Sequence, residues 1–417
     1  MQCKKLSGAF ALMAILGFTP FAMTLRAAAQ QEKVVHSFSP AGRVGAYPSA
    51  PLTFDAAGNL YGSTGLGGAY NFGTIFELMP AVSGGWTLKV LHNFGNGTDG
   101  QSPSGVLIFD TAGNLYGTTS GGGSHGNAGT VFKLSPQPSG AWKETILHSF
   151  NPNASDGYNP AGGVVLDASG NLYGTTNLGG SNNTGSVFKL SAAGGTWAET
   201  LLHSFGNSNT SDGQEPYLVQ LSIDAAGNLY GTTEYGGAYK NGAVFEVSPV
   251  GGGGWTESVL YSFNPNSSEG YSPSSGVIMD SAGNLYGTLY FGGANNAGSV
   301  FKLSPASGGG WTETTIHNFK NDGIDGRNPA ASLIFDLAGS LYGNTNDGGA
   351  YGYGTAFVLI RAGGGGWAEK LLHTFNHDGE DGYYPFAPLT LSALGILYGT
   401  TNIGGIYNEG TVFAIKP

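Results

Sequence analysis

The sequence predicts an all-β protein, a seven-bladed β-propeller built from four-stranded antiparallel blades. Three observations predict this fold. A unit of about 56 residues occurs seven times, each unit holds four short apolar or β-branched runs, and the chain begins with the segment that closes the other units. None of the units carries a helical pattern of apolar residues.

The repeat is marked by the segment GNLYG and its variants GSLYG and GILYG, whose tyrosines recur every 55 to 57 residues. A fixed period of this length is typical of propellers and solenoids. The coils of a parallel β-helix are shorter, and an open solenoid needs atypical polar caps at its ends. The seven tyrosines are Tyr61, Tyr116, Tyr173, Tyr230, Tyr286, Tyr342 and Tyr398.

Each unit contains four candidate strands separated by turn residues. Residues 103–150, for example, contain the runs GVLIFD, NLYGTT, GTVFKLS and WKETILHSF, which are long enough for strands and too short for helices. In the first turn we expect Asp110 to accept a backbone N–H and Gly113 to adopt a positive φ. The other connections contain Gly-Gly, a Gly-rich loop before Trp, or Asp-Gly and Pro, as antiparallel hairpins require.

The two chain ends are complementary. Residues 33–38, KVVHSF, match the fourth run of the other units, whereas the last unit stops at residues 410–417 without such a run. We therefore expect the first strand to pair with the last and to complete the seventh blade. Such pairing would close the ring and remove an exposed sheet edge.

The motifs GNLYGTT, GTVFKLSP and GGWTETxLHSF, followed by DG-x-x-P, resemble the GloVer tandem repeat of exported, mostly bacterial proteins. The resemblance covers residues 33–417. It implies a propeller and export, and it supplies no catalytic residues. Together with the repeats it divides the chain into residues 1–29, a signal peptide, and residues 30–417, a single propeller domain.

Residues 1–29 have the features of a secretory signal: two lysines, an apolar run from Leu6 to Met23 and an Ala-rich cleavage site. A membrane anchor is the alternative. Cleavage leaves 13 basic against 27 acidic side chains, a net charge of −14, which argues against nucleic acid as a partner. Cys3 is the only cysteine, and no later apolar run could span a bilayer. We expect a secreted, periplasmic or extracellular monomer without a membrane partner.

Candidate binding residues lie in the loops between the second and third strands, which should share one face with the connections between units. These loops vary and are rich in Tyr and Asn, side chains that can stack on sugar rings and bond their hydroxyls. Ordinary loop tips are the alternative explanation. The candidates are Tyr70, Asn71, Asn182, Asn183, Tyr239, Asn295, Tyr351 and Tyr407.

Acidic residues recur in the connections between units, and we expect them to ring the mouth of the channel. They are Asp99, Asp156, Asp212, Glu269, Asp325 and Asp381, with Val44 in the remaining copy. Asp325 in NDGIDG and Asp381 in HDGEDG are the candidate ligands for Ca²⁺, although neither loop has the EF-hand pattern. No other cofactor is indicated.

Histidines recur at one position of the fourth strand, where we expect hydrogen bonds between blades instead of a shared metal site. They are His36, His92, His148, His203, His317 and His373, with Tyr261 in the remaining copy. No catalytic residue is assigned, although Glu215, Asp378 and Glu380 have the right chemistry. The leading hypothesis is a module that binds extracellular glycan or another surface polymer. A polysaccharide hydrolase or lyase and a protein-binding scaffold are the alternatives.

Overall fold

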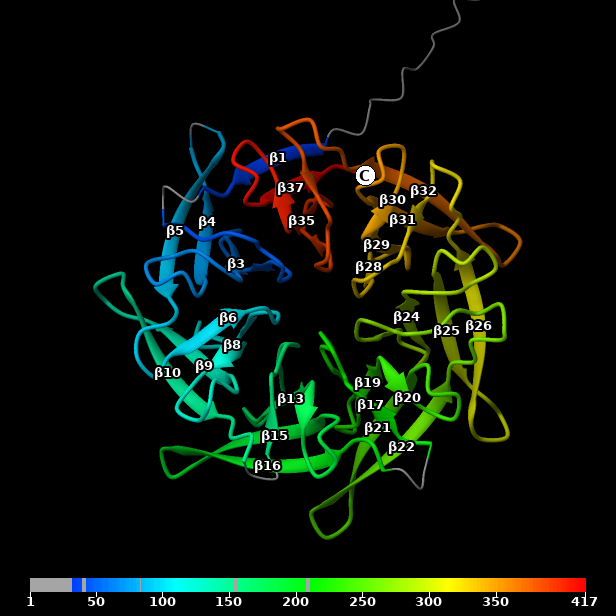
Figure 1. The fold of residues 1–417 in the computed structure, drawn as a ribbon, viewed down its shortest axis with the longest axis horizontal. Coiled ribbons are helices and arrows are strands. Elements are labelled where there is room, and N and C mark those ends of the chain that lie inside the picture. Colours follow the sequence, from blue (N-terminus) through cyan, green and yellow to red (C-terminus); the bar gives the residue numbers. More distant parts are fainter. Residues whose placement is uncertain (1–31, 40–42, 83, 154–155, 208–210) are drawn as a thin grey trace, which may run out of the picture.

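The computed structural model describes residues 32–39, 43–82, 84–153, 156–207 and 211–417. The signal peptide expected at residues 1–29 lies outside these ranges. Every regular element within them is a β-strand, and the principal strands form seven antiparallel sheets, the blades, arranged around a central axis (Figure 1). The predicted seven-bladed propeller is confirmed.

Each blade runs outward from the axis in chain order. The first contains β2 (Thr53–Phe54), β3 (Leu60–Thr64), β4 (Thr74–Pro80) and β5 (Trp86–Asn93). The second blade contains β7 (Ile108–Phe109), β8 (Leu115–Gly122), β9 (Thr130–Pro136) and β10 (Trp142–Ser149), and the third contains β12 (Val165–Leu166), β13 (Leu172–Thr176), β15 (Ser186–Ala193) and β16 (Thr196–Ser204). The fourth contains β18 (Ser222–Ile223), β19 (Leu229–Thr233), β21 (Ala243–Val250) and β22 (Gly254–Ser262), and the fifth contains β23 (Ile278–Met279), β24 (Leu285–Leu289), β25 (Ser299–Pro305) and β26 (Trp311–Asn318). The sixth contains β28 (Ile334–Phe335), β29 (Leu341–Thr345), β31 (Thr355–Arg361) and β32 (Trp367–Thr374).

The seventh blade joins the two ends of the chain. Its inner strands are β34 (Thr390–Leu391), β35 (Leu397–Thr401) and β37 (Thr411–Ile415), and its outermost strand is β1 (Glu32–Ser37). β1 lies antiparallel to β37, and the two strands appear side by side in blue and red in Figure 1. The first strand therefore closes the ring as predicted.

The innermost strands are shorter than the sequence predicts. Only two residues of each GVLIFD-like run form a strand. The backbones of neighbouring blades meet closely just before these strands. A Cβ added to Gly162 would lie 2.1 Å from the carbonyl oxygen of Val219, and one added to Gly105 would lie 2.5 Å from that of Gly162. Only glycine allows this approach at these two positions.

The turn after each innermost strand has the expected chemistry. Asp110 Oδ1 accepts hydrogen bonds from the backbone N–H groups of Ala112 and Asn114, both at 2.9 Å, and Gly113 has a φ of 80°. The Tyr116 hydroxyl donates to Asp110 Oδ2 at 3.0 Å. Burial tends to raise the pKa of Asp110, but the hydrogen bonds outweigh it and hold the pKa below its usual value. The tyrosine of the LYG motif thus ties its strand to the turn.

The hydrophobic core consists of seven clusters, one at each boundary between blades. One cluster joins Tyr116 and Phe150 of the second blade to Leu172 and Phe188 of the third. At another boundary the Trp142 ring lies 6.2 Å from the ring of Tyr61 in the preceding blade. The outer-strand aromatic residues therefore fill the gaps between blades, as expected.

We predict that Phe38→Ala lowers the free energy of unfolding by about 3–5 kcal/mol, the usual cost of truncating a buried Phe. Phe38 is fully buried and belongs to the cluster that joins the seventh blade to the first. Chemical denaturation of the variant and the wild type measures the difference. Lys33→Ala is the matched control, because Lys33 lies exposed on the same strand. Equal effects of the two substitutions would contradict a closing role for this strand.

Candidate functional site

A second set of short antiparallel strand pairs shapes one face of the ring, and the sequence analysis missed it. The connection between blades pairs with the loop that follows the second strand: β11 (Gly157–Tyr158), for example, pairs with β14 (Leu178–Gly179). The signal was present, because the glycine of an Asp-Gly pair, replaced by Val-Gly in the first unit and Glu-Gly in the fifth, precedes a Gly-Gly pair by 22 or 23 residues. The glycines of the two pairs face each other. The equivalent pairs are β6 (Gly100–Pro103) with β8, β17 (Gly213–Gln214) with β20 (Tyr235–Gly236), β27 (Gly326–Arg327) with β30 (Asp347–Gly348) and β33 (Gly382–Tyr383) with β36 (Ile403–Gly404).

These strand pairs hold the connections between blades and the loops between the second and third strands on one face, which we call the loop face. Six of the predicted binding residues occupy a single tip position on it, and they behave in two ways. The tyrosines are 47–61% exposed. The side chains of Asn182 and Asn295 instead donate to the backbone carbonyls of Phe205 and Phe319, each at 3.0 Å. The seven tip residues are Tyr70, Gly126, Asn182, Tyr239, Asn295, Tyr351 and Tyr407.

The residue after the tip has a left-handed backbone in every copy, which explains why it is usually Asn. The predicted residues Asn71 and Asn183 stand at this position, with φ values of 64° and 60°. Their side-chain oxygens accept hydrogen bonds from the N–H of Gly67 and the hydroxyl of Tyr158, at 3.2 and 3.1 Å. These asparagines shape the loops, whereas the tip tyrosines are free to contact a ligand.

The loop face is most aromatic between the sixth and seventh blades. The rings of Tyr353, His377 and Tyr383 lie 4.9–5.7 Å from one another, and Tyr384 lies 5.2 Å from Tyr383. Tyr353 and His377 of this group line an open cavity of about 410 Å³. We call it the aromatic pocket; its lining residues are Tyr351, Tyr353, Asn376, His377 and Asp378.

Polar groups complete the aromatic pocket. The backbone N–H groups of Asp381 and Glu380 donate to Asp378 Oδ1 and hold the pKa of that carboxyl below its usual value. Asp378 is exposed, so an ionised carboxylate stands beside the tyrosine rings. The pocket therefore combines flat apolar rings with a hydrogen-bond acceptor.

The repeated acids do not ring the channel, so that expectation is wrong. Small and apolar residues such as Ser104, Ala161 and Pro388 line the channel, and no acid is among its described lining residues. The aspartates instead reach the histidine of the preceding outer strand. The Nε2–Oδ distances are 3.0 Å for His92–Asp99, 3.1 Å for His148–Asp156, 3.2 Å for His203–Asp212 and 2.9 Å for His373–Asp381.

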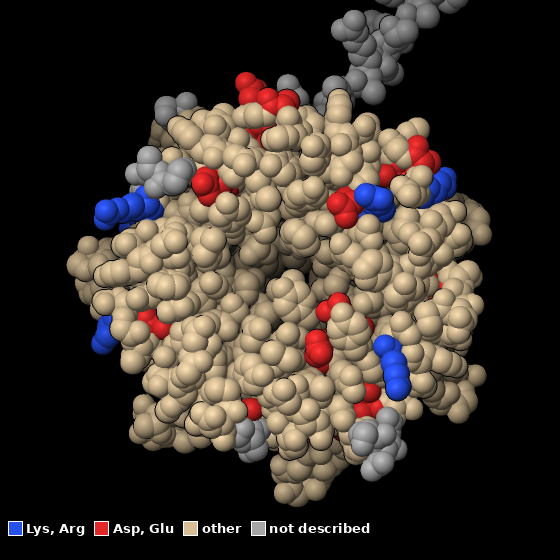
Figure 2. Space-filling model, viewed as in Figure 1, with Lys and Arg blue, Asp and Glu red and all other residues tan. Residues whose placement is uncertain are grey.

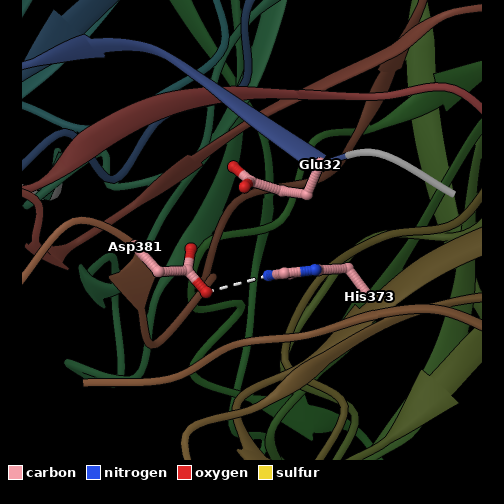
Figure 3. Close-up of side chains that lie close together, drawn as sticks. All are labelled: Glu32, His373 and Asp381. Atoms are coloured by element: carbon pink, nitrogen blue, oxygen red, sulfur yellow. Dashed lines mark hydrogen bonds and ion pairs between the residues drawn. The ribbon is translucent and has the colours of Figure 1, made fainter. Parts of the chain in front are cut away.

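A glutamate from the next blade approaches each of these pairs. Figure 3 shows one such group, with Glu32 of β1 beside the bonded pair of His373 and Asp381. Burial, followed by the charge of Asp381, raises the pKa of Glu32 to about 7. Four of the six histidines form the expected hydrogen bonds, whereas Nε2 of His36 and of His317 has no partner among the described residues. The sequence could not reveal that an acid of the next blade also approaches each bonded pair. We call each set of outer-strand histidine, aspartate and next-blade glutamate a seam, and use the same name for the residues at the equivalent positions of every blade boundary.

Two seams depart from the repeat. Where His36 stands, Val44 and Leu88 replace both acids, and the boundary is apolar. Where Tyr261 replaces the histidine, its hydroxyl donates to Glu269 at 2.6 Å. Both acids are therefore absent from the apolar boundary, although a histidine stands there.

The two candidate Ca²⁺ ligands lie in seams. Asp325 accepts backbone N–H groups from Lys320 and Gly326, at 2.9 and 2.7 Å, and Asp381 accepts those of Asn376 and Gly382. These hydrogen bonds occupy one lone pair on each bonded oxygen, and a single carboxylate falls well short of the six to eight oxygens that Ca²⁺ takes. Binding of Ca²⁺ in these loops stays a prediction.

The acids considered for catalysis come from different parts of the ring. Glu215 directly follows β17 in the fourth blade, where its charge acts on Glu234. Asp378 and Glu380 precede β33 at the boundary of the sixth and seventh blades. β17 lies across the ring from the seventh-blade strands β35 and β37 in Figure 1, so Glu215 does not meet the other two acids.

Fold and repeat together define a β-propeller repeat protein. The chain belongs to the Gloeobacter/Verrucomicrobia repeat family, whose model matches residues 19–222, 127–357 and 219–417. This match confirms the resemblance drawn from the sequence motifs. No curated protein matches the chain. Within the described part of the chain, none of the elements is a helix that could cross a membrane.

Solved structures share the fold at low identity. One is the extracellular domain of a protein described as a hybrid two-component system from B. thetaiotaomicron, with 13% identity, a TM-score of 0.58 and coverage of 93% of this chain and 42% of that one. Another is described as an ancestral GH74 enzyme, with 13% identity, a TM-score of 0.56 and coverage of 89% and 47%. This chain spans less than half the length of either structure. At such identity the likeness concerns the fold alone.

The seam glutamates predict that stability falls as the pH rises. Burial raises the pKa of Glu257 from 4.5 to about 7, with Asp212 adding to the rise and His203 opposing it. A raised pKa means that the folded state holds the proton more tightly than the unfolded state. The contribution of Glu257 is therefore full below about pH 4.5 and is lost as the pH rises through about 7.

We expect Glu257→Gln, which is neutral at every pH, to reduce the fall in melting temperature between pH 5 and pH 8 relative to the wild type. Thermal melts in chelator across this range measure the effect. Glu380→Gln changes an exposed acid and should leave the slope unchanged. An identical slope in all three proteins would show that Glu257 has the same pKa in the folded and unfolded states.

Proposed function

We propose that this chain is an exported propeller that binds an extracellular glycan or similar surface polymer on its loop face, chiefly in the aromatic pocket. The observation that carries the proposal is the convergence of Tyr351, Tyr353 and His377 with the acceptors of Asn376 and Asp378 around one open cavity. Aromatic faces pack against the apolar faces of sugar rings, while amide and carboxylate oxygens accept hydrogen bonds from hydroxyls. The export that the repeat resemblance implies supports the extracellular setting, as does an extracellular domain among the solved structures with this fold.

The charge of the protein narrows the ligand class. Lys and Arg side chains are few and separated on the face seen in Figure 2. The pocket itself presents the Asp378 carboxylate, and acids outnumber basic residues 27 to 16 in the whole chain. An anionic polymer would be repelled. A neutral glycan therefore fits better than a uronic-acid or sulfated chain.

Tip tyrosines outside the pocket extend this surface. Tyr407 belongs to the seventh blade and Tyr70 to the first, so both stand on blades next to or near the pocket, whereas Tyr239 stands on the fourth. A polymer that crosses the loop face can meet several of these rings. Exposed tyrosines are also enriched in protein interfaces, so a protein partner is the second candidate.

The test is titration of the purified protein with a panel of neutral and acidic oligosaccharides. Tyr353→Ala should weaken binding of the preferred neutral glycan about tenfold, or ~1.4 kcal/mol, because it removes a stacking face. Tyr351→Ala should act in the same direction.

Tyr239→Ala is the matched control, because this tip tyrosine has a similar exposure and lies on the fourth blade. It should change the affinity less than twofold. Equal losses in all variants would place the contact on the whole ring of tips instead of the aromatic pocket. Saturable binding that none of the substitutions reduces would contradict the proposed surface.

A further inference from the structure

The seam between the fifth and sixth blades differs from the others in geometry. His317 comes from β26, Asp325 from the loop before β27, and Glu369 from β32. The Nε2 atom of His317 lies 3.9 Å from Asp325 Oδ2 and 3.5 Å from Glu369 Oε2. One donor atom from each residue lies within 4.8 Å of the other two, as in three other seams. Three ligand-type side chains thus converge from two blades.

This seam contains buried polar atoms that lack a partner among the described residues. His317 Nε2 and Glu369 Oε1 are both buried without a hydrogen bond. One glutamate oxygen is unpaired in the same way in each of the other histidine–aspartate seams, so the unpaired nitrogen is what distinguishes this seam from them. In the four other seams that contain a histidine–aspartate pair, Nε2 lies 2.9–3.2 Å from the aspartate and is bonded to it. An unpaired buried nitrogen beside unpaired carboxylate oxygen is costly unless something else binds there.

The spacing suits a small dication. Ligands held about 2.0–2.2 Å from a tetrahedral ion are themselves roughly 3.3–3.6 Å apart. The 3.5 Å separation of His317 and Glu369 falls in this range, and the 3.9 Å separation of His317 and Asp325 needs only a small adjustment. A dication would also offset the repulsion that the two carboxylates exert on each other when both are ionised.

We propose that His317, Asp325 and Glu369 form a binding site for a divalent transition-metal ion of the Zn²⁺ type. Imidazole nitrogen with carboxylate oxygen is a donor set that such ions prefer, whereas Ca²⁺ takes six to eight oxygens. Three protein ligands leave a further position for water. This site is separate from the glycan surface, and neither proposal depends on the other.

The side chains can act as ligands without rearranging the backbone. Asp325 Oδ2 accepts the N–H of Lys320 and keeps a second lone pair for the metal. The side chains of His317, Asp325 and Glu369 are 15%, 7% and 16% exposed, so an ion can enter from solvent. Since His317 and Glu369 come from the outer strands of neighbouring blades, the bound ion would link two blades.

The test measures Zn²⁺ affinity of the full-length protein, prepared without a histidine tag, by competition with a chromophoric chelator. His317→Ala should lower the affinity at least about 100-fold, since even outer-sphere partners of a metal are worth about 10- to 100-fold. Glu369→Gln, which keeps the size of the side chain, should also lose this binding. Visible absorption of bound Co²⁺ reports the ligand geometry independently.

His36→Ala is the matched control. His36 occupies the equivalent strand position and its Nε2 is likewise buried without a partner, but Val44 and Leu88 stand where the acids would be. This variant should keep the Zn²⁺ affinity of the wild type. Melting in chelator checks that each variant is folded, and added Zn²⁺ should raise the melting temperature of the wild type and of His36→Ala only.

The outcomes separate the alternatives. Loss of one tight equivalent of Zn²⁺ in His317→Ala and Glu369→Gln, but not in His36→Ala, would support the site. Zn²⁺ uptake that is unchanged in the folded Glu369→Gln and His317→Ala proteins would overturn it. Complete displacement of Zn²⁺ by a modest excess of Ca²⁺ would also overturn it, because it would indicate a site made of oxygens alone.

Discussion

The pairing of β1 with β37 is the contact on which the rest of the structure depends. Each blade buries its apolar surface only against its two neighbours, so a row of seven blades would leave one uncovered face at each end. The pairing of Val34 with Phe413 places Phe38 in the last of the seven boundary clusters. Closure therefore buries both faces of every blade against a neighbouring blade, although the sequences of the blades differ.

The same repetition separates structural from functional positions. The aspartate turns, the outer-strand phenylalanines and the left-handed asparagines recur because each blade has the same geometrical needs. The aromatic pocket occurs where the loops are most unlike the others, with Tyr353 and His377 at positions where the other units have different residues. Binding on this face would thus use side chains that the fold itself does not require.

The sequence was sufficient for the fold and only partly sufficient for the site. Period, turn chemistry and the displaced strand at residues 33–38 predicted a closed ring, because each is a local pattern. The sequence could not show that Glu144 reaches His92, since that contact depends on the distance between the outer strands of two blades. It also could not separate Tyr351, an exposed tip, from Asn183, whose left-handed backbone explains its identity.

Hydrogen exchange of the backbone amides in β1 tests ring closure most directly. The account predicts that the amides of β1 bonded to β37 exchange as slowly as those of interior strands such as β19, because opening the closure would expose two boundary clusters at once. Fast exchange across β1, with slow exchange in the six other outer strands, would contradict the account. It would mean that the ring stands without its first strand.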